Sequence, residues 1–164
     1  MQLDNKKTPE VDLRKFAGQF AAGVSVISTA DDEGLCAGIT MTAVMSLSLT
    51  PPLFLVSLDN NSKTLTAILD NGHFCINFLS KEQSTVSQLF SSKSDDKFDN
   101  VSFYKGITGS PCLEGALAHG ECEVHESYSG GDHTIIIGRV INTAINGGEP
   151  LVYHSGKYAT LEHQ

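Results

Sequence analysis

Short extended segments separated by turn residues constrain the fold more than any other feature of this sequence. Residues 24–29, 53–58, 73–79 and 134–140 are rich in Val, Ile, Leu and Phe, and Gly, Pro or Asn stands near most of their ends. β-Branched and aromatic residues favour strands, whereas Gly, Pro and Asn favour the turns between strands. With helices only as connectors, this pattern predicts a mainly β chain, a β-barrel with peripheral helices.

Length and charge limit the classes of protein to consider. A chain of 164 residues is expected to form a single domain over residues 1–164, with residues 1–10 as a loose N-terminal tail. The formal charge of −8 argues against nucleic acid or an anionic membrane as a partner, because both bind basic surfaces. No apolar run approaches the ~18 residues of a membrane span. The polar N-terminus has no signal-peptide core, so we expect a cytoplasmic protein.

The cysteines and histidines do not point to a metal site. The four cysteines contain no C-x-x-C pair and have apolar neighbours, so we expect buried thiols, with disulfides or zinc as the less favoured alternative. On the predicted strand 118–125, two His and two Glu alternate with small or apolar residues. Side chains at i and i+2 of a strand are ~7 Å apart, too far for one compact site, so these four are expected on a solvated outer face: His119, Glu121, Glu123 and His125.

Three helices are predicted, one before the first strand and two between later strands. The first spans residues 11–22 and ends at Gly23; its apolar stripe consists of Leu13, Phe16, Ala17 and Phe20. The second spans 62–70, and the third follows a capping-box pattern at 80–83 and continues through residue 90. Residues 91–110 are polar and are expected to form an irregular loop, longer than a simple connection requires.

The hydroxyl-rich stretch from Gly38 to Pro52 is the first candidate binding segment. In an extended backbone every second side chain lies on the same face. This spacing predicts one row of hydroxyls, formed by Thr40, Thr42, Ser46, Ser48 and Thr50, and an apolar row formed by Ile39, Met41, Ala43, Met45 and Leu47. Composition alone favours the simpler alternative, an ordinary strand with one wet face or a loop before the two prolines.

The start of the second predicted helix is a candidate anion site. Asn61, Ser62, Lys63 and Thr64 place hydroxyls and an ammonium beside the free N–H groups of the first helical turn, a combination suited to a phosphate. Plain N-capping by Asn61 or Ser62 needs no ligand and remains the alternative.

Two later motifs carry further polar groups. Residues 130–133, Gly-Gly-Asp-His, read as a hairpin turn before an apolar strand, where a lone His133 is more often structural than catalytic. Near the end, residues 155–158 read Ser-Gly-Lys-Tyr. Neither a Rossmann glycine motif nor a P-loop occurs in the sequence, so a nucleotide would have to be held in another way.

Several of these motifs together resemble the short-chain flavin reductases, the reductase components of two-component flavin-dependent monooxygenases of the phenol and 4-hydroxyphenylacetate hydroxylase type. The family's G-x-T-x-x-x-x-x-S-x-S-x-x-P-P is matched at 38–52, its G-D-H-T-x-x-x-G-x-V at 131–140 and its P-L-x-x-x-x-G-x-Y at 150–158. The resemblance spans about residues 14–161. It implies a Greek-key split barrel of the FMN-binding type that forms a homodimer with flavin at the interface.

The resemblance also implies an activity and a set of site residues. The activity is hydride transfer from NADH or NADPH to N5 of FMN or FAD, and the reduced flavin passes to a separate monooxygenase. The residues implied for the flavin are Thr40, Met41, Thr42, Ala43, Val44, Ser46, Leu47, Asn61, Ser62, Lys63, Thr64 and Lys97; those for the nicotinamide are His133, in the catalytic position, Ser155, Gly156, Lys157 and Tyr158. Many members have Ser or Asn where this chain has Thr42 and Ala43, which leaves open which side chains touch the ring edge.

Three other functions remain open at this point. A flavin-dependent reductase of ferric iron or cobalamin would use the same site. A non-catalytic flavin-binding protein would keep the 38–64 half without needing His133 or Tyr158, and a scaffold would need neither half. Both halves occur in this chain, which favours the flavin reductase.

Overall fold

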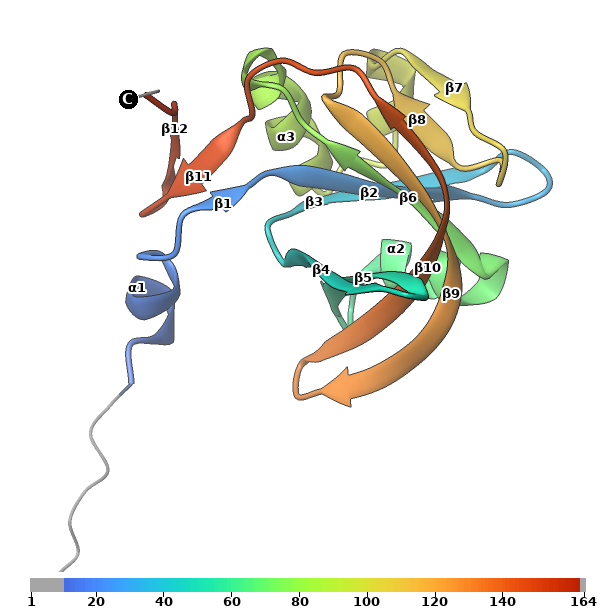
Figure 1. The fold of residues 1–164 in the computed structure, drawn as a ribbon, viewed down its shortest axis with the longest axis horizontal. Helices are drawn as coiled ribbons and strands as arrows, with labels where there is room; N and C mark the ends of the chain where they lie inside the picture. The colour runs from blue at the N-terminus through green and yellow to red at the C-terminus, as the bar shows by residue number, and fades with distance from the viewer. Residues whose placement is uncertain (1–10, 163–164) are drawn as a thin grey trace, which may run out of the picture.

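A computed structural model describes residues 11–162, and a curved seven-stranded antiparallel sheet forms its body (Figure 1). The strand order is β3-β2-β6-β9-β10-β5-β4. Their bounds are β2 Ser25–Ala30, β3 Cys36–Met41, β4 Val44–Leu49, β5 Pro52–Asp59, β6 His73–Phe78, β9 Ala118–Gly130 and β10 His133–Ile145. The predicted tail at residues 1–10 lies outside the described residues.

The two edge strands of this sheet, β3 and β4, follow one another in the chain. Within residues 11–162 they form no ladder with each other, so the curved sheet stays open between them. Only Thr42 and Ala43 separate the two strands, and this turn therefore lies at the opening. The mainly β, split-barrel prediction is confirmed.

Helices cover both faces of the sheet around β2. Helix α2 (Lys63–Asn71) packs on β2, β3 and β6, and α3 (Ser84–Ser91), preceded by a 3₁₀ turn at Lys81–Gln83, packs on β3 and β2. Because successive strand residues face opposite sides, Ile27 joins the core that contains α2, and Val26 joins the second core, which contains Phe90 of α3. All six residues of β2 are buried for this reason.

Two small sheets extend the body. Strands β1 (Ala22–Gly23), β11 (Val152–His154) and β12 (Lys157–Ala159) form one of them. With α1 (Leu13–Ala17) they form an arm that projects on the left of Figure 1. Strands β7 (Phe103–Lys105) and β8 (Pro111–Leu113) form the other, and a 3₁₀ turn at Lys97–Asn100 precedes them.

Most of the predicted elements are confirmed. The strands at 24–29, 53–58, 73–79 and 134–140 correspond to β2, β5, β6 and β10, and the helix at 62–70 corresponds to α2. The capping box is present: the Ser80 N–H donates to Gln83 Oε1 at 3.0 Å. Cys75, Cys112 and Cys122 are buried free thiols as expected, whereas Cys36, also free, is only half-buried.

The predicted helix over residues 11–22 is wrong in its length. Helix α1 covers only Leu13–Ala17, begins at the side-chain cap of Asp12 and has no buried residue. Phe16 and Phe20 are 76% and 79% exposed. A five-residue helix is unstable alone, so the apolar stripe indicates a surface that this single chain leaves uncovered.

The predicted solvated face of the strand 118–125 is wrong for its first half. His119 and Glu121 are each only 3% exposed, whereas Glu123 and His125 are exposed as expected. The cause is the β7–β8 hairpin and its turn, which lie over the start of β9: Thr108 donates to Glu121 through its N–H and its hydroxyl, at 2.8 and 2.9 Å. The loop expected at 91–110 is therefore not irregular throughout: it contains the 3₁₀ turn at Lys97–Asn100, strand β7 and the turn that leads to β8.

Two further findings concern the described residues only. Between residues 11 and 162, no helix is long and apolar enough to cross a membrane. In the same part of the chain, no group of three or more His, Cys, Asp or Glu side chains is placed to hold a metal ion.

Candidate functional site

A pocket of about 250 Å³ lies between β3, α3 and the β11–β12 hairpin. It brings together four residues predicted from the sequence, Thr40, Met41, Thr42 and Tyr158, although Tyr158 is more than a hundred positions from the other three in the chain. Its other lining residues are Val24, Ser87, Ser91 and Tyr153. Sequence reasoning missed these four; Tyr153 stands within the matched 150–158 motif, but Ser87 and Ser91 lie on a helix without any motif.

Ser87 of α3 holds the two sides of this pocket in place. The Thr40 hydroxyl donates to the Ser87 carbonyl at 2.7 Å, and the Tyr158 hydroxyl donates to Ser87 Oγ at 2.8 Å. The Tyr153 and Tyr158 rings meet edge to face, 5.7 Å apart. The pocket therefore combines flat apolar surfaces with fixed polar groups, as small-molecule sites usually do.

A close contact between β3 and α3 positions Ser87. A Cβ on Gly38 would lie 2.7 Å from the ring of Phe90 and 3.0 Å from that of Phe98, so only glycine lets the helix approach this near. Lys97 crosses the same junction: its ammonium donates to the carbonyls of Gly38 and Phe90 at 3.3 and 3.0 Å. Burial lowers the pKa of Lys97. The lysine expected to face a ligand is thus engaged in packing.

The predicted single row of hydroxyls over 38–52 is wrong. The chain turns at Thr42 and Ala43 between β3 and β4, and a bulge interrupts the β4 register between Ser46 and Ser48. Each irregularity shifts the alternation of side chains. Thr40 therefore faces α3 and the pocket, whereas Ser46 is exposed on an edge strand.

The turn at the sheet opening is fixed through its backbone. The Ser57 N–H donates to the Ala43 carbonyl at 3.1 Å, and the Val44 N–H donates to the Thr42 carbonyl at 2.9 Å. The Val44 side chain is partly buried and packs against the core. Leu47, at the bulge, is an exposed side chain of the edge strand β4.

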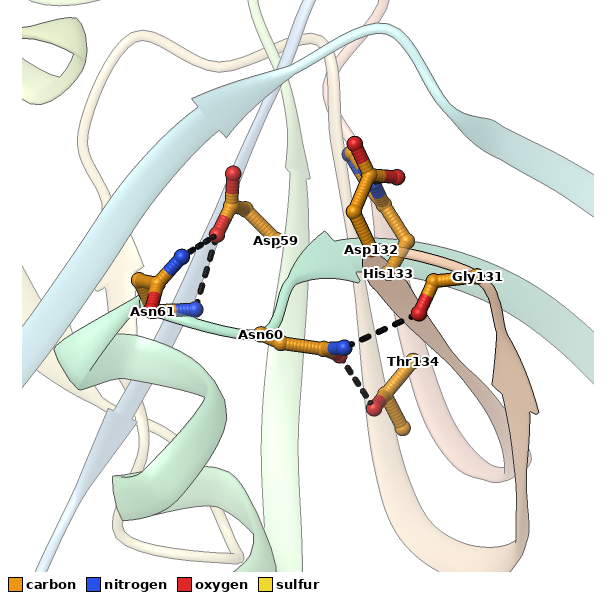
Figure 2. Close-up of polar contacts among 7 residues, drawn as sticks. All are labelled: Asp59, Asn60, Asn61, Gly131, Asp132, His133 and Thr134. Atoms are coloured by element: carbon orange, nitrogen blue, oxygen red, sulfur yellow. Dashed lines mark hydrogen bonds and ion pairs between the residues drawn. The ribbon is translucent and has the colours of Figure 1, made fainter.

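A second cluster lies where the end of β5 meets the β9–β10 hairpin (Figure 2). Asn60 links the two segments: its amide donates to the Gly131 carbonyl at 3.2 Å, its Oδ1 accepts from the Thr134 hydroxyl at 2.8 Å, and its N–H donates to the Asp132 carbonyl at 3.0 Å. Asp59 accepts from the N–H and amide of Asn61. The structure thereby places His133 opposite Asp59, at the end of β5.

His133 and Asp132 form an exposed pair at the hairpin turn. Nδ1 of His133 lies 2.7 Å from the Asp132 carboxylate. The hydrogen bond from the imidazole lowers the pKa of Asp132, so the carboxylate stays ionised and holds the ring. The side chains of both residues stand on the same side of the hairpin in Figure 2.

At the start of α2, some of the groups that could bind an anion are already engaged in other contacts. Ser62 is the N-cap residue, but among the described contacts its side chain makes no capping hydrogen bond. Lys63 pairs with Asp95 at 2.7 Å, and both side chains are exposed. Thr64 is buried, which leaves its backbone N–H rather than its hydroxyl for an incoming anion.

Ser155 and Gly156 form the tight turn of the β11–β12 hairpin, and Lys157 and Tyr158 begin β12. Ser155 and Gly156 have φ of +49° and +79°, the two positive values that a two-residue type I′ turn requires. Ser155 donates to the Gly18 carbonyl through its N–H at 2.8 Å, which ties the hairpin to the end of α1. Lys157 is exposed and Tyr158 lines the pocket.

A single chain does not bring His133 together with residues 155–158. His133 begins a strand of the seven-stranded sheet, whereas Tyr158 belongs to the three-stranded one. Figure 1 shows the β9–β10 tip and the β11–β12 hairpin well apart. The expected nicotinamide half is thus divided: Tyr158 lies with Thr40–Thr42 in the pocket, and His133 pairs with Asp59 at the end of β5.

Comparison with known proteins gives this geometry a context. Residues 17–162 match the family described as flavin reductase like domain. An NADH-dependent flavin reductase of a Rhodococcus species is 40% identical over 98% of this chain and 91% of its own length. The reductase subunit of a flavin-dependent monooxygenase from Rhodococcus jostii is 37% identical over 93% of this chain and 80% of its own length. An NADH:FAD oxidoreductase of Streptomyces globisporus, solved with NAD and FAD fragments, superposes with a TM-score of 0.87 at 31% identity, over 92% of this chain and 91% of that one.

Proposed function

The chain belongs to the flavin reductase-like family, and from that premise we propose that it is an NAD(P)H:flavin oxidoreductase that supplies reduced FMN or FAD to a separate monooxygenase. The observation that carries the proposal is the pocket joining Thr40, Met41 and Thr42 to Tyr158, because it unites the two sequence motifs expected at the flavin and at the nicotinamide. Relatives named NADH-dependent flavin reductase and monooxygenase reductase subunit support it.

The residues of the pocket fit a flavin. Two tyrosine rings and the Met41 side chain offer flat or adaptable apolar surface, and the hydroxyl of Thr42 and the backbone of the Thr42–Ala43 turn offer polar contacts at the edge of a ring. The uncapped first turn of α2, at Ser62 and Lys63, suits the phosphate of the same molecule. When bound, the flavin supplies the electron-accepting chemistry at its N5.

The role of the protein is to hold the nicotinamide ring in the correct position against the flavin ring. His133 and Asp132 form a charge-assisted hydrogen bond on the hairpin. This bond keeps the imidazole in one orientation for contact with the nicotinamide half of the cofactor. Hydride transfer needs no general base, so the contribution of such a group is positioning and electrostatic stabilisation. Tyr158 and Lys157 would contact the same half from the other hairpin.

We propose a homodimer in which the two halves come from different copies. On the arm, the side chains of Leu13, Phe16 and Phe20 form an exposed apolar surface that one chain leaves uncovered. Leu47 and Leu49 expose further apolar surface on the edge strand β4. A second copy over the arm would bury this surface and let residues 155–158 of one copy approach His133 of the other. The proposed cytoplasmic location rests on the four free thiols and on the need for NAD(P)H.

The experiment measures flavin binding and NADH oxidation separately. Flavin affinity is read from quenching of flavin fluorescence, and the turnover from NADH consumption with FMN and with FAD, using NADPH as the comparison. We expect His133→Ala to lower the turnover roughly 10- to 100-fold with little change in flavin affinity. His125→Ala, an exposed histidine of β9, is the matched control and should leave both unchanged.

One result would overturn the proposed function, and a second would overturn only the role of His133. Tight flavin binding without reduction by either nicotinamide would identify a non-catalytic flavin-binding protein. Equal turnover in wild type and His133→Ala would remove His133 from the reaction while leaving the reductase activity in place.

A further inference from the structure

Two buried cysteines lie side by side on the opposite side of β2 and β6 from α2. Cys75 is on β6 and Cys112 on β8, their Sγ atoms are 3.7 Å apart, and the side chains are 0% and 1% exposed. The sequence separation of the two residues gives no hint of this contact. The other two cysteines contact backbone carbonyls instead: Cys122 that of Gly120, and Cys36 that of Gly34.

The strand that carries Cys112 is fixed to the sheet on both sides of it. The Ser28 hydroxyl donates to the Pro111 carbonyl at 2.6 Å. The Leu113 N–H donates to Oδ1 of Asn77 at 2.7 Å, and Asn77 is two residues after Cys75 and on the same face of β6. Because the neighbours of both cysteines are held by buried hydrogen bonds, the short sulfur–sulfur distance is a property of the packing.

A cavity borders Cys112. It measures about 220 Å³, and its walls include Tyr104, Gly106, Ile107 and His119, with Cys112 among the lining residues. The share of liquid volume of a water molecule is about 30 Å³, so the cavity has room for a molecule as small as hydrogen peroxide. This cavity is separate from the pocket of Thr40 and Tyr158.

The two thiols are not equivalent. The hydrogen bond from the Cys75 thiol lowers the pKa of Cys112, although burial and the charge of Glu121 oppose the shift; the Tyr104 hydroxyl and the Gly106 N–H act in the same direction as Cys75. The same contact raises the pKa of Cys75, and burial raises it further. Cys112 is therefore the sulfur that becomes a thiolate first, and it is the one that borders the cavity.

We propose that Cys75 and Cys112 form a peroxide-reactive dithiol centre that closes into an intramolecular disulfide. In the first step Cys112 Sγ attacks one oxygen of hydrogen peroxide, the O–O bond breaks, and the departing hydroxide takes a proton to become water. Cys75 Sγ then attacks Cys112 Sγ, the S–O bond breaks, and the second hydroxide takes the Cys75 proton. The two sulfurs lose two electrons in all, and the peroxide gains them.

Formation of the Cys75–Cys112 disulfide requires a modest movement of the two strands that carry the cysteines. The sulfur atoms must approach from 3.7 Å to about 2.05 Å, and the two-stranded β7–β8 sheet is the smaller of the two parts that can shift. The closed loop would contain α3, which carries Ser87 of the candidate site. Such a link is expected to raise the midpoint of thermal unfolding by roughly 5–10 °C.

The test treats the reduced protein with hydrogen peroxide, without flavin or nicotinamide, so that its outcome does not depend on the proposed function. Remaining thiols are alkylated in denaturant, the disulfides are then reduced and alkylated with a second reagent, and the peptides are identified by mass spectrometry. We expect two of the four thiols to be lost, a single crosslink between Cys75 and Cys112, and full recovery with dithiothreitol.

Variants separate the two steps. Cys75→Ser should leave Cys112 as a sulfenic acid that dimedone labels, and Cys122→Ser, at a buried cysteine whose thiol contacts the Gly120 carbonyl, should behave as wild type. The peptide map of the wild type decides the question even if Cys75→Ser fails to fold. Oxidation confined to Cys36, a crosslink to another cysteine, or peroxide-treated protein in which both Cys75 and Cys112 remain alkylatable would overturn the proposal.

Discussion

At the scale of single residues, every buried side-chain nitrogen or oxygen atom between residues 11 and 162 has a hydrogen-bond partner. Asn77 is fully buried, donates to the Val26 carbonyl and the Ser28 hydroxyl, and accepts from the Leu113 N–H. Glu121 accepts two hydrogen bonds from Thr108 and one from Asn142. Since a buried group that loses its partner costs more than the bond contributed, these residues are sensitive points of the fold.

Glu121 provides a prediction that depends on pH. Burial raises the pKa of this carboxyl, but the hydrogen bonds from Thr108 and Asn142 outweigh burial, and the net shift is downward. A lowered folded pKa means that the carboxylate stabilises the fold above the unfolded pKa of about 4.3, and that this contribution is lost as the pH falls through the folded pKa. Glu121→Gln should therefore lower the unfolding free energy by about 1–3 kcal/mol at neutral pH, measured by urea unfolding.

The control for this prediction is Glu123→Gln, the next acidic residue of β9, which is exposed and pairs only with Arg139 at the surface. It should change the unfolding free energy by less than about 1 kcal/mol. The gap in unfolding free energy between Glu121→Gln and wild type should be smaller at acidic than at neutral pH, because the wild-type carboxyl takes up a proton as the pH falls through its folded pKa. An equal gap at both pH values would show that the loss is steric.

Tyr158 allows the ring and the hydroxyl to be tested apart. Tyr158→Phe keeps the ring in the pocket and removes only the hydrogen bond to Ser87, so the KM values for flavin and NADH should change by about 2- to 5-fold. Tyr158→Ala removes the ring as well and should have a larger effect on both. Steady-state kinetics of the two variants side by side measures the difference, and equal effects would mean that the ring has no contact with either ligand.

At the scale of elements, the fold was predictable where local patterns decide it. Apolar β-branched segments became β2, β5, β6 and β10, and Ser80 with Gln83 formed the expected capping box. The errors come from tertiary contacts. A bulge in β4 broke the row of hydroxyls, and the β7–β8 hairpin buried His119 and Glu121, whose alternation alone is typical of a wet face.

The candidate site was predictable only in part. Motif resemblance identified Thr40–Thr42 and Tyr158, which the structure brings into one pocket. It could not identify Ser87, because that serine enters the site through the packing of α3 on β3 and no local pattern marks it. It also could not show that His133 and Tyr158 lie in different parts of one chain.

The junction of α3 with β3 gives the prediction for this scale. Gly38→Ala would place a methyl group 2.7 Å from the buried Phe90 ring, and overpacking of this kind costs about 1–3 kcal/mol. We expect a drop of roughly 2–10 °C in the thermal midpoint and weaker flavin binding, since Ser87 moves with the helix. Gly120→Ala is the matched control, a strand glycine with nothing within 4 Å of the added Cβ; a drop of the same size in both variants would contradict the role of the contact.

At the scale of the whole molecule, one chain appears as an open barrel with an apolar arm. The arm carries Phe16 and Phe20 on its surface, and Tyr158 is in its β11–β12 hairpin. Burying a phenylalanine side chain contributes about 1.5–3 kcal/mol. A second copy that covers the arm would therefore gain stability and would bring the divided halves of the site closer together.

The proposed dimer makes the arm testable. Phe16→Ser combined with Phe20→Ser should shift the mass measured by light scattering from dimer to monomer and should reduce flavin-dependent NADH oxidation, because the halves of the site separate. Leu35→Ser is the control: this leucine is 75% exposed, but it lies at the β2–β3 turn, away from the arm. A wild-type protein that is monomeric at all concentrations, yet fully active, would contradict the composite site.

The measurement that tests the central claim most directly is an anaerobic single turnover. Protein loaded with FMN or FAD is mixed rapidly with NADH, or with NADH deuterated at the reacting carbon of the nicotinamide, and the flavin absorbance is followed. The account predicts rapid bleaching that slows with the deuterated nicotinamide and slows further in His133→Ala. A flavin that binds to the protein and stays oxidised in the presence of excess NADH and NADPH would contradict it.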